Sequence, residues 1–222
     1  MDAVILLNKP AGMTSFDAVA KCRKIFHERK IGHTGTLDPE ASGLMIILLG
    51  KYTKLLPYCV KNHKAYQATL KLGEMTDTED IWGTVIETKT PSIHTSEEIE
   101  KAVQSLTGDI LQVPPMYSAL KKDGKKLYEY ARQGIEIERE ARPVHISSLK
   151  VEKIDETNYR MNAVVSSGTY IRTLITDFGK QLDELAIMSS LIRTKIEHLS
   201  LKDACTFEDL ESGVSFLSPI QV

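Results

Sequence analysis

The chain has few cysteines, and their arrangement excludes a disulfide-stabilised scaffold. Cys22, Cys59 and Cys205 are the only three among 222 residues, and they lie far apart without forming a CxxC pair. An odd number of widely spaced thiols is most simply explained by buried, reduced cysteines in a cytosolic compartment. The six histidines lack the spacing of a zinc finger or of an HExxH helix. We therefore expect no metal ion.

Long hydrophobic runs and an N-terminal targeting segment are also missing. The longest purely apolar run, residues 44–49, is too short to cross a bilayer. The first ten residues, MDAVILLNKP, carry an acid at position 2 and no basic cluster, which is unlike a secretory signal. With 42% hydrophobic and 26% charged residues, the composition is that of an ordinary globular protein. We expect a cytoplasmic protein without a membrane partner.

An excess of positive charge is the third absence. The formal net charge is −2 at pH 7, whereas proteins that bind nucleic acid over a broad surface are usually basic. Composition therefore argues weakly against an RNA partner, and any such partner must be held by local basic patches.

Hydrophobic periodicity predicts more strands than long helices. Residues 64–72, KAYQATLKL, place Tyr66 and alternate apolar residues on one face, as in a half-buried strand. A capping box of Thr95 and Glu98 predicts a helix. Further strands are expected over 3–7, 44–49, 83–88 (the partner of 64–72), 145–153, 159–166 and 191–199, and further helices over 16–26, with Phe16 on its apolar face, 51–58, up to Gly134, 168–182 and near Phe207. Because the strands form hairpin-like pairs, we predict an α+β fold, a largely antiparallel mixed sheet with flanking helices.

One polar turn, GHTGTLDPEASGLM over residues 32–45, directly precedes the apolar run. Asp-Pro followed by Glu between glycines is good turn chemistry, and the local pattern favours an Asx-type turn at Asp38. His33 alone is more often a hydrogen-bonded loop residue than a catalyst, although its charge can change near neutral pH. This turn is the first candidate site.

The second candidate is SSGTYIRTL, residues 166–174, in which small residues precede a helix. Arg172 is expected on the polar side of that helix, near the N-terminus, where the helix dipole slightly disfavours a cation. A carboxylate or a phosphate could hold it there. A solvated surface arginine explains the local pattern equally well.

The third candidate is PPMYSALKKDGKKLYEYARQG, which interleaves cations with tyrosines. Cations that follow a backbone, together with rings on which bases stack, suit looped or single-stranded RNA. A solvated lysine-rich turn is the alternative for a charge run taken alone. The residues concerned are Lys121, Lys122, Lys125, Lys126, Arg132, Tyr117, Tyr128 and Tyr130.

Five blocks taken together are far more specific than any one of them. They are NKPAGMTSFDAV, KIGHTGTLDPEASGLM, KAYQATLKLGEMTDTEDIWGTV, GDILQVPPMYSALKKDGKKLYEYARQGIEI and SSGTYIRTLITDFG, in this order. With them the chain closely resembles the bacterial tRNA pseudouridine-55 synthases over roughly residues 3–200. The resemblance implies a pseudouridine synthase-like catalytic domain.

The resemblance also implies a reaction. The family converts the uridine of the tRNA T loop into pseudouridine without cofactor or metal, by breaking the N-glycosidic bond, turning the base and rejoining it through carbon 5. Asp38 matches the essential carboxylate, and Arg172 the arginine that pairs with it. Tyr66 matches the tyrosine on which the target base stacks, and His33 the residue that replaces the extruded base. Whether Asp38 adds to the base, adds to the sugar or abstracts a sugar proton stays open.

The same resemblance implies how RNA is bound. Residues 112–142 resemble an insertion that closes over the T stem-loop, with lysines placed on phosphates. Lys9 belongs to the first block, which supports the active-site loop. We expect tRNA as partner, a monomer, and a substrate-binding set of His33, Lys9, Lys121, Lys122, Lys125, Lys126, Arg132, Tyr170 and Arg193.

Two departures from the family pattern stand out. We expect a catalytic domain over residues 1–205 and a short tail over 206–222, where the family usually carries a C-terminal RNA-binding domain; a naturally short chain and a truncated one both fit. The family commonly has Leu-Arg-Arg near the last strand, whereas this chain has Leu191, Ile192 and Arg193. Two alternatives to the enzyme remain, a non-catalytic tRNA-folding module on the same scaffold and an RNA-guided synthase subunit.

Overall fold

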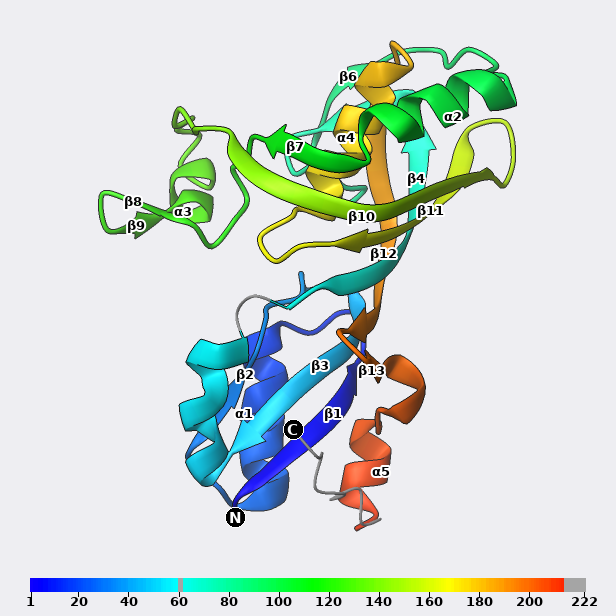
Figure 1. Ribbon diagram of the computed structural model, residues 1–222. Coiled ribbons are helices and arrows are strands. Elements are labelled where there is room, and N and C mark those ends of the chain that lie inside the picture. The colour runs from blue at the N-terminus through cyan, green and yellow to red at the C-terminus, as the bar shows by residue number, and fades with distance from the viewer. Residues whose placement is uncertain (60–61, 214–222) are drawn as a thin grey trace. The chain divides into compact units, whose positions relative to one another are not determined.

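The computed structural model describes residues 1–59 and 62–213 of the chain. It contains two compact units, shown in Figure 1. Unit 1 consists of residues 1–67 and the chain from residue 190 onward, and unit 2 consists of residues 68–189. Most strand pairs are antiparallel and helices flank them, so the predicted α+β class is confirmed.

The sheet of unit 1 is built on a buried central strand. Strand β3, Ser42–Leu49, pairs antiparallel along its length with β1, Ala3–Lys9. It also pairs antiparallel with β2, Ile31–His33, and in parallel with β12, Ala186–Ile196, through Arg193 and its neighbour. The other elements of unit 1 are α1 (Ser15–Phe26), the 3-10 helix η1 (Gly50–Cys59), β13 (Leu199–Ser200), η2 (Leu201–Asp203) and α5 (Phe207–Glu211).

Helix α1 begins where the sequence predicts. The Thr14 hydroxyl accepts a hydrogen bond from the Asp17 amide at 3.0 Å, and the Asp17 carboxylate accepts one from the Thr14 amide at 3.2 Å. The buried stripe consists of Ser15, Ala18, Val19 and Cys22. The prediction that Phe16 belongs to the apolar face is wrong, because this side chain is 69% exposed. The helical period gives the first buried position to Ser15 and turns position 16 outward.

The main sheet of unit 2 has the strand order β12-β4-β11-β10-β7. Strand β4, Lys64–Leu72, starts in unit 1 and continues into unit 2. Strand β12 starts in unit 2 and continues into unit 1. The last long strand, β12, begins at residue 186 rather than at the predicted 191. Strands β10 and β11 lie close to their predicted ranges, and the predicted capping box is present at the start of α2. The bounds are β7 (Gly108–Gln112), β10 (Arg142–Lys153), β11 (Asn158–Val165), α2 (Ser96–Ser105) and α4 (Ile171–Gln181).

The segment after β4 does not pair with β4 as predicted. Strand β6, Val85–Thr88, pairs instead with β5, Glu74–Thr76, in a separate two-stranded sheet. Gly73 bends the chain between β4 and β5 with a φ of +95°, and a Cβ there would lie 2.8 Å from the Lys89 carbonyl oxygen. This close approach and the left-handed φ both require glycine.

The basic turn of the sequence is a small hairpin, and the short helix predicted to follow it is present but ends at Ala131 rather than at Gly134. Strands β8, Lys121–Lys122, and β9, Lys125–Lys126, pair antiparallel. Helix α3, Leu127–Ala131, follows directly. This hairpin and helix lie within the 112–142 insertion.

All three cysteines are free thiols in the structure. Burial raises the pKa of Cys22 to about 12 and that of Cys205 to about 11, so both stay protonated and unreactive at neutral pH. Among the described residues, every helix falls short of the length and hydrophobicity that a bilayer crossing requires.

Candidate active site

The loop that carries Asp38 joins β2 to β3. Leu37, immediately before Asp38, is buried with 3% exposure, whereas Asp38 itself is half-buried. The Asp38 carbonyl accepts a hydrogen bond from the Ala41 amide at 3.1 Å, which closes a turn over Pro39. The predicted turn is therefore present, and its closing bond comes from the backbone.

Ser15 holds the residue before Asp38 from the N-terminal turn of α1. Its hydroxyl donates to the Leu37 carbonyl at 3.0 Å and accepts from the Leu37 amide at 2.9 Å. Ser15 is only 3% exposed, so water does not compete for these bonds. This residue was missed from the sequence, because no local pattern links Ser15 to Leu37.

Lys9 holds the residue after Asp38. Its ammonium group donates to the carbonyls of Pro10 at 2.7 Å, Met13 at 2.6 Å and Pro39 at 3.1 Å. The side chain has no exposed surface. Burial lowers the pKa of Lys9 to about 8, while the charges of Glu40 and Asp38 oppose this shift.

Arg193, in the C-terminal half of β12, holds the start of the same loop. Its Nη2 donates to the Gly35 carbonyl at 3.1 Å, its Nη1 to the Thr36 carbonyl at 3.3 Å and its Nε to the Leu44 carbonyl at 2.7 Å. It is 1% exposed. A guanidinium with fixed donors is suited to binding several carbonyls at once.

We call Lys9, Ser15 and Arg193 the anchor residues, since together they bind the backbone on both sides of Asp38. Lys9 and Arg193 were expected to bind substrate, and this expectation conflicts with their burial. Their donors are directed to backbone carbonyls of this chain, so they support the loop instead of facing RNA. For Lys9 this agrees with the supporting role of its sequence block.

His33 and Tyr66 are the other candidates in unit 1. His33 is half-buried at the end of β2, and its Nδ1 is buried without a hydrogen-bond partner among the described residues. Burial lowers the pKa of His33, the charge of Arg193 adds to this effect, and a contact with the Gly35 backbone opposes it, which favours the neutral imidazole. Tyr66 is half-buried on β4, where the predicted alternation is confirmed by buried Ala68 and Leu70.

Arg172 lies in the first turn of α4 in unit 2. Of the two alternatives that the local pattern left open, the solvated one is excluded, because Arg172 is 5% exposed. Its Nη1 donates to the Thr78 carbonyl and its Nη2 to the Tyr117 carbonyl, each at 2.9 Å. These bonds offset the cost of burying the cation. Asp38 belongs to the other unit, so its pairing with Arg172 stays a prediction.

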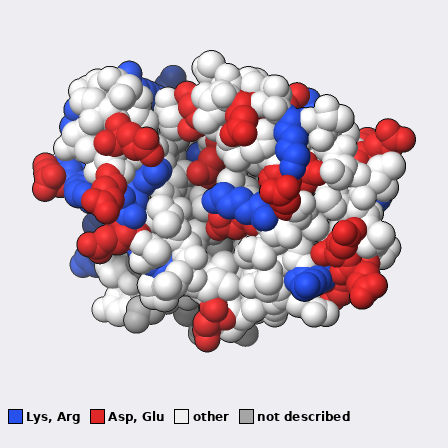
Figure 2. Space-filling view, turned by 90° about the horizontal axis from the view of Figure 1, so that it is seen from above, with Lys and Arg blue, Asp and Glu red and all other residues white. Residues whose placement is uncertain are grey.

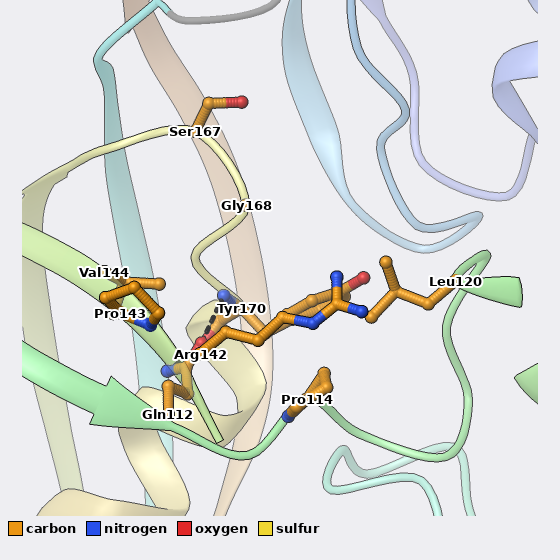
Figure 3. A pocket seen from close by; sticks show the side chains of 9 residues that line it. All are labelled: Gln112, Pro114, Leu120, Arg142, Pro143, Val144, Ser167, Gly168 and Tyr170. Atoms are coloured by element: carbon orange, nitrogen blue, oxygen red, sulfur yellow. Dashed lines mark hydrogen bonds between the residues drawn. The ribbon is translucent and has the colours of Figure 1, made fainter. Parts of the chain in front are cut away.

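Tyr170 caps the same helix at the edge of a cavity of about 220 Å³ in unit 2 (Figure 3). Its amide donates to the Gln112 side-chain oxygen at 2.8 Å, and the Gln112 amide group donates to the Tyr170 carbonyl at 3.1 Å. Pro114, Leu120, Arg142, Pro143, Val144, Ser167 and Gly168 complete the lining. The paired amides fix the position of the Tyr170 backbone against the base of the insertion.

The lysines of the insertion differ in their exposure and in the groups that they contact. Lys121 and Lys122 are exposed, although the Lys122 ammonium group donates to the Glu138 carbonyl at 2.8 Å. The ammonium groups of Lys125 and Lys126 lie 4.6 Å and 5.3 Å from the ring centroids of Tyr130 and Tyr128, and the Arg132 guanidinium lies 5.2 Å from that of Tyr128. Cations and rings thus meet within the insertion itself.

Positive charge does not dominate the face drawn in Figure 2, where Lys and Arg side chains are interspersed with Asp and Glu. This distribution agrees with the net charge of −2. Any nucleic-acid contact on this face would have to rely on local groups of cations rather than on a broad basic surface.

Comparison with known proteins identifies the family. The model of the TruB family pseudouridylate synthase N-terminal domain matches residues 23–171. The chain belongs to the TruB family of pseudouridylate synthases. The matched range contains the Asp38 loop, β4 and the insertion, and it ends one residue before Arg172.

Relatives and solved structures agree with this assignment. The chain is 45% identical to tRNA pseudouridine synthase B of Oceanobacillus iheyensis over 97% of this chain and 72% of that protein. It is 46% identical to the enzyme of the same name from Endomicrobium trichonymphae, over 96% of this chain and 93% of that protein. A chain in the crystal structure of a Cbf5-Nop10-Gar1 complex is similar with a TM-score of 0.72 and 29% identity, over 95% of this chain and 54% of that one.

Proposed function

We propose that this protein is a tRNA pseudouridine synthase that isomerises uridine 55 in the T loop. The observation that carries the proposal is the anchored loop. In a TruB-family chain, one half-buried carboxylate, Asp38, sits between backbone groups that three buried side chains hold. Such preorganisation is what a residue acting on a fixed reacting atom requires.

The remaining roles follow from chemistry and placement. Asp38 serves as nucleophile or base beside the sugar of the target nucleotide. Arg172, whose other donors are fixed in unit 2, would keep Asp38 ionised. Tyr66 would stack on the target base, and the neutral ring of His33 would fill the gap that base flipping leaves in the RNA loop.

RNA binding is assigned to groups outside the anchored loop. The exposed Lys121 and Lys122 are the best candidates for phosphate contacts. Lys125, Lys126 and Arg132 would contribute through the tyrosine rings on which they lie, and Tyr170 through the edge of the unit 2 cavity. We propose a cytoplasmic monomer acting on the T stem-loop.

The alternatives receive less support. An RNA-guided subunit would fit the similarity to the Cbf5 complex, but that similarity is 29% identity, against 45% to 47% for relatives named tRNA pseudouridine synthase B. A non-catalytic folding module would not need a carboxylate held by three buried side chains.

Asp38→Asn tests the proposal. The wild-type chain should release tritium from 5-tritiated uridine in unmodified tRNA and in an isolated T-arm stem-loop, with the product mapped to position 55. The variant should abolish release while tRNA binding persists. Glu40→Gln, which removes a second carboxylate from the same loop, is the matched control and should stay active.

Three outcomes would contradict the proposal. Turnover unchanged in Asp38→Asn would remove the assigned role of this residue. Binding of tRNA by the wild type without turnover would favour the folding module, and activity that requires added guide RNA and proteins would favour the guided subunit.

A further inference from the structure

Glu79 is a carboxylate that the proposed reaction leaves unused. It lies in the turn between β5 and β6 with a left-handed φ of +63°. Its amide donates to the Thr76 carbonyl at 3.2 Å, and its carbonyl accepts from the Met188 amide at 3.1 Å. A non-glycine residue keeps such a conformation only where its surroundings fix it, and here both backbone groups are fixed.

The side chain of Glu79 binds the first turn of α4. Its carboxylate accepts a hydrogen bond from the Thr173 hydroxyl at 2.8 Å. Thr173 is 5% exposed and directly follows Arg172. The bond therefore joins the β5–β6 turn to the residue next to the key arginine.

Arg172 binds the same turn through the neighbouring residue. Its Nη1 donates to the Thr78 carbonyl, one position before Glu79. Residues 78 and 79 thus bind the Arg172 guanidinium and the Thr173 hydroxyl at once. A guanidinium between such fixed partners has little freedom to change its direction.

The charges around Glu79 come mostly from α4. Burial raises the pKa of Glu79, whereas the Thr173 hydrogen bond and the Arg172 charge lower it. Asp177 adds to the rise and Lys180 opposes it, and these two residues form an ion pair with each other at 3.0 Å.

We propose that Glu79 is a positioning residue for the pseudouridine synthase reaction. Through Thr173 it fixes the first turn of α4, and so it sets the direction of the Arg172 guanidinium toward the reacting group. The proposal rests on the proposed function, and it assigns no contact between Glu79 and RNA.

Single-turnover rates on unmodified tRNA test the hydrogen bond. Glu79→Ala and Thr173→Val should each lower the rate about tenfold, with the tRNA dissociation constant changed less than about twofold, because misplacement of a catalytic group slows the reaction without weakening the remaining contacts. The double variant should be no slower than either single one, since both changes remove one interaction. Thr173→Ser keeps the hydroxyl and should restore most of the rate.

The pH profile separates positioning from simple structural support. In the wild type, protonation of Glu79 weakens the acceptor of the Thr173 bond, so the rate should fall on the acid side. Glu79→Gln keeps an uncharged acceptor at every pH and should flatten that acid limb. Glu152→Gln, at the solvent-accessible Lys150–Glu152 pair, is the matched control and should leave both rate and profile unchanged.

A spectroscopic measurement keeps the test independent of turnover. The Arg172 Nε–H resonance should shift in Glu79→Ala and Thr173→Val and stay near its wild-type position in Thr173→Ser. Additive losses in the double variant, or an unmoved Arg172 signal in Glu79→Ala, would overturn the proposal. A wild-type chain that forms no pseudouridine would refute the proposed function instead, while the Arg172 signal would still decide the role of Glu79.

Discussion

Ser15 and Leu37 exchange two hydrogen bonds, one in each direction, across 22 positions of sequence. The serine hydroxyl takes the place of a strand partner for one residue of the loop, because it satisfies both the amide and the carbonyl of Leu37. Asp38 follows directly. The conformation of the acidic loop is therefore set by a helix start that precedes it in the chain.

Ser15→Ala should destabilise the protein and slow it. The buried amide and carbonyl of Leu37 would lose their partner, at a cost of about 1–3 kcal/mol. The free energy of unfolding in urea and the single-turnover rate should both decrease. Ser200→Ala, which removes a hydroxyl that accepts one bond from the exposed Lys202 amide at 3.3 Å, should change neither by a comparable amount. Equal effects of the two variants would show that the loop does not depend on Ser15.

Lys9 should make stability depend on pH in the alkaline range. Its folded pKa is about 8 and its ordinary value is 10.5, so between these values the unfolded chain binds more protons than the folded one. Stability contributed by this group therefore rises as pH increases through that window. The difference in unfolding free energy between wild type and Lys9→Met should widen from pH 7.5 to pH 10. A constant difference for Lys9→Met would contradict the assignment.

Gly43→Ala should destabilise the fold more than a glycine substitution that only strains the backbone at a positive φ. Gly43 has a φ of +111°, and a Cβ there would lie 2.4 Å from the Arg193 carbonyl oxygen and 2.7 Å from its amide nitrogen. The substitution would push β12 from β3 and displace Arg193 from the loop. Gly12→Ala, at a φ of +76° with no atom within 4 Å of a Cβ, should cost only about 1 kcal/mol. Thermal unfolding measures the melting temperatures of the two variants. Similar values would show that the close approach of Gly43 to the Arg193 backbone does not limit the side chain at position 43.

Replacing Lys121, Lys122, Lys125 and Lys126 by alanine should weaken tRNA binding and reduce its salt dependence. Each phosphate contact that is lost lowers the slope of log affinity against log salt by roughly 0.7 to 0.9. Titrations at several salt concentrations measure this slope. Alanine at Lys101 and Lys153, two exposed lysines of the same unit outside the insertion, is the control. A slope identical to the wild type would show that the insertion does not touch RNA.

Local patterns predicted the elements well where local forces decide them. The alternation of β4, the capping box at Thr95 and the apolar run of β3 depend on neighbours within a few residues, and all three are present. The pairing of β6 was mispredicted, because the bend at Gly73 is required by a close approach to the distant Lys89 carbonyl.

The candidate site could be located from the sequence but not built from it. The family resemblance singled out Asp38 and Arg172, yet helical periodicity could not decide whether Arg172 is buried against a partner or solvated. Its burial depends on the Thr78 and Tyr117 carbonyls, 94 and 55 positions away. Ser15 was missed for the same reason. Lys9 and Arg193 were expected to contact substrate, whereas they bind backbone carbonyls. No local pattern reports which backbone carbonyl a buried donor will reach.

The anchor residues also impose an order on the making of this enzyme. Lys9 and Ser15 precede the loop in the chain, whereas Arg193 lies 158 positions after Gly35 and is translated later. Until then the carbonyls of Gly35 and Thr36 lack the guanidinium that binds them in the finished protein. A nascent chain therefore carries Asp38 before the guanidinium that holds the start of its loop has been made.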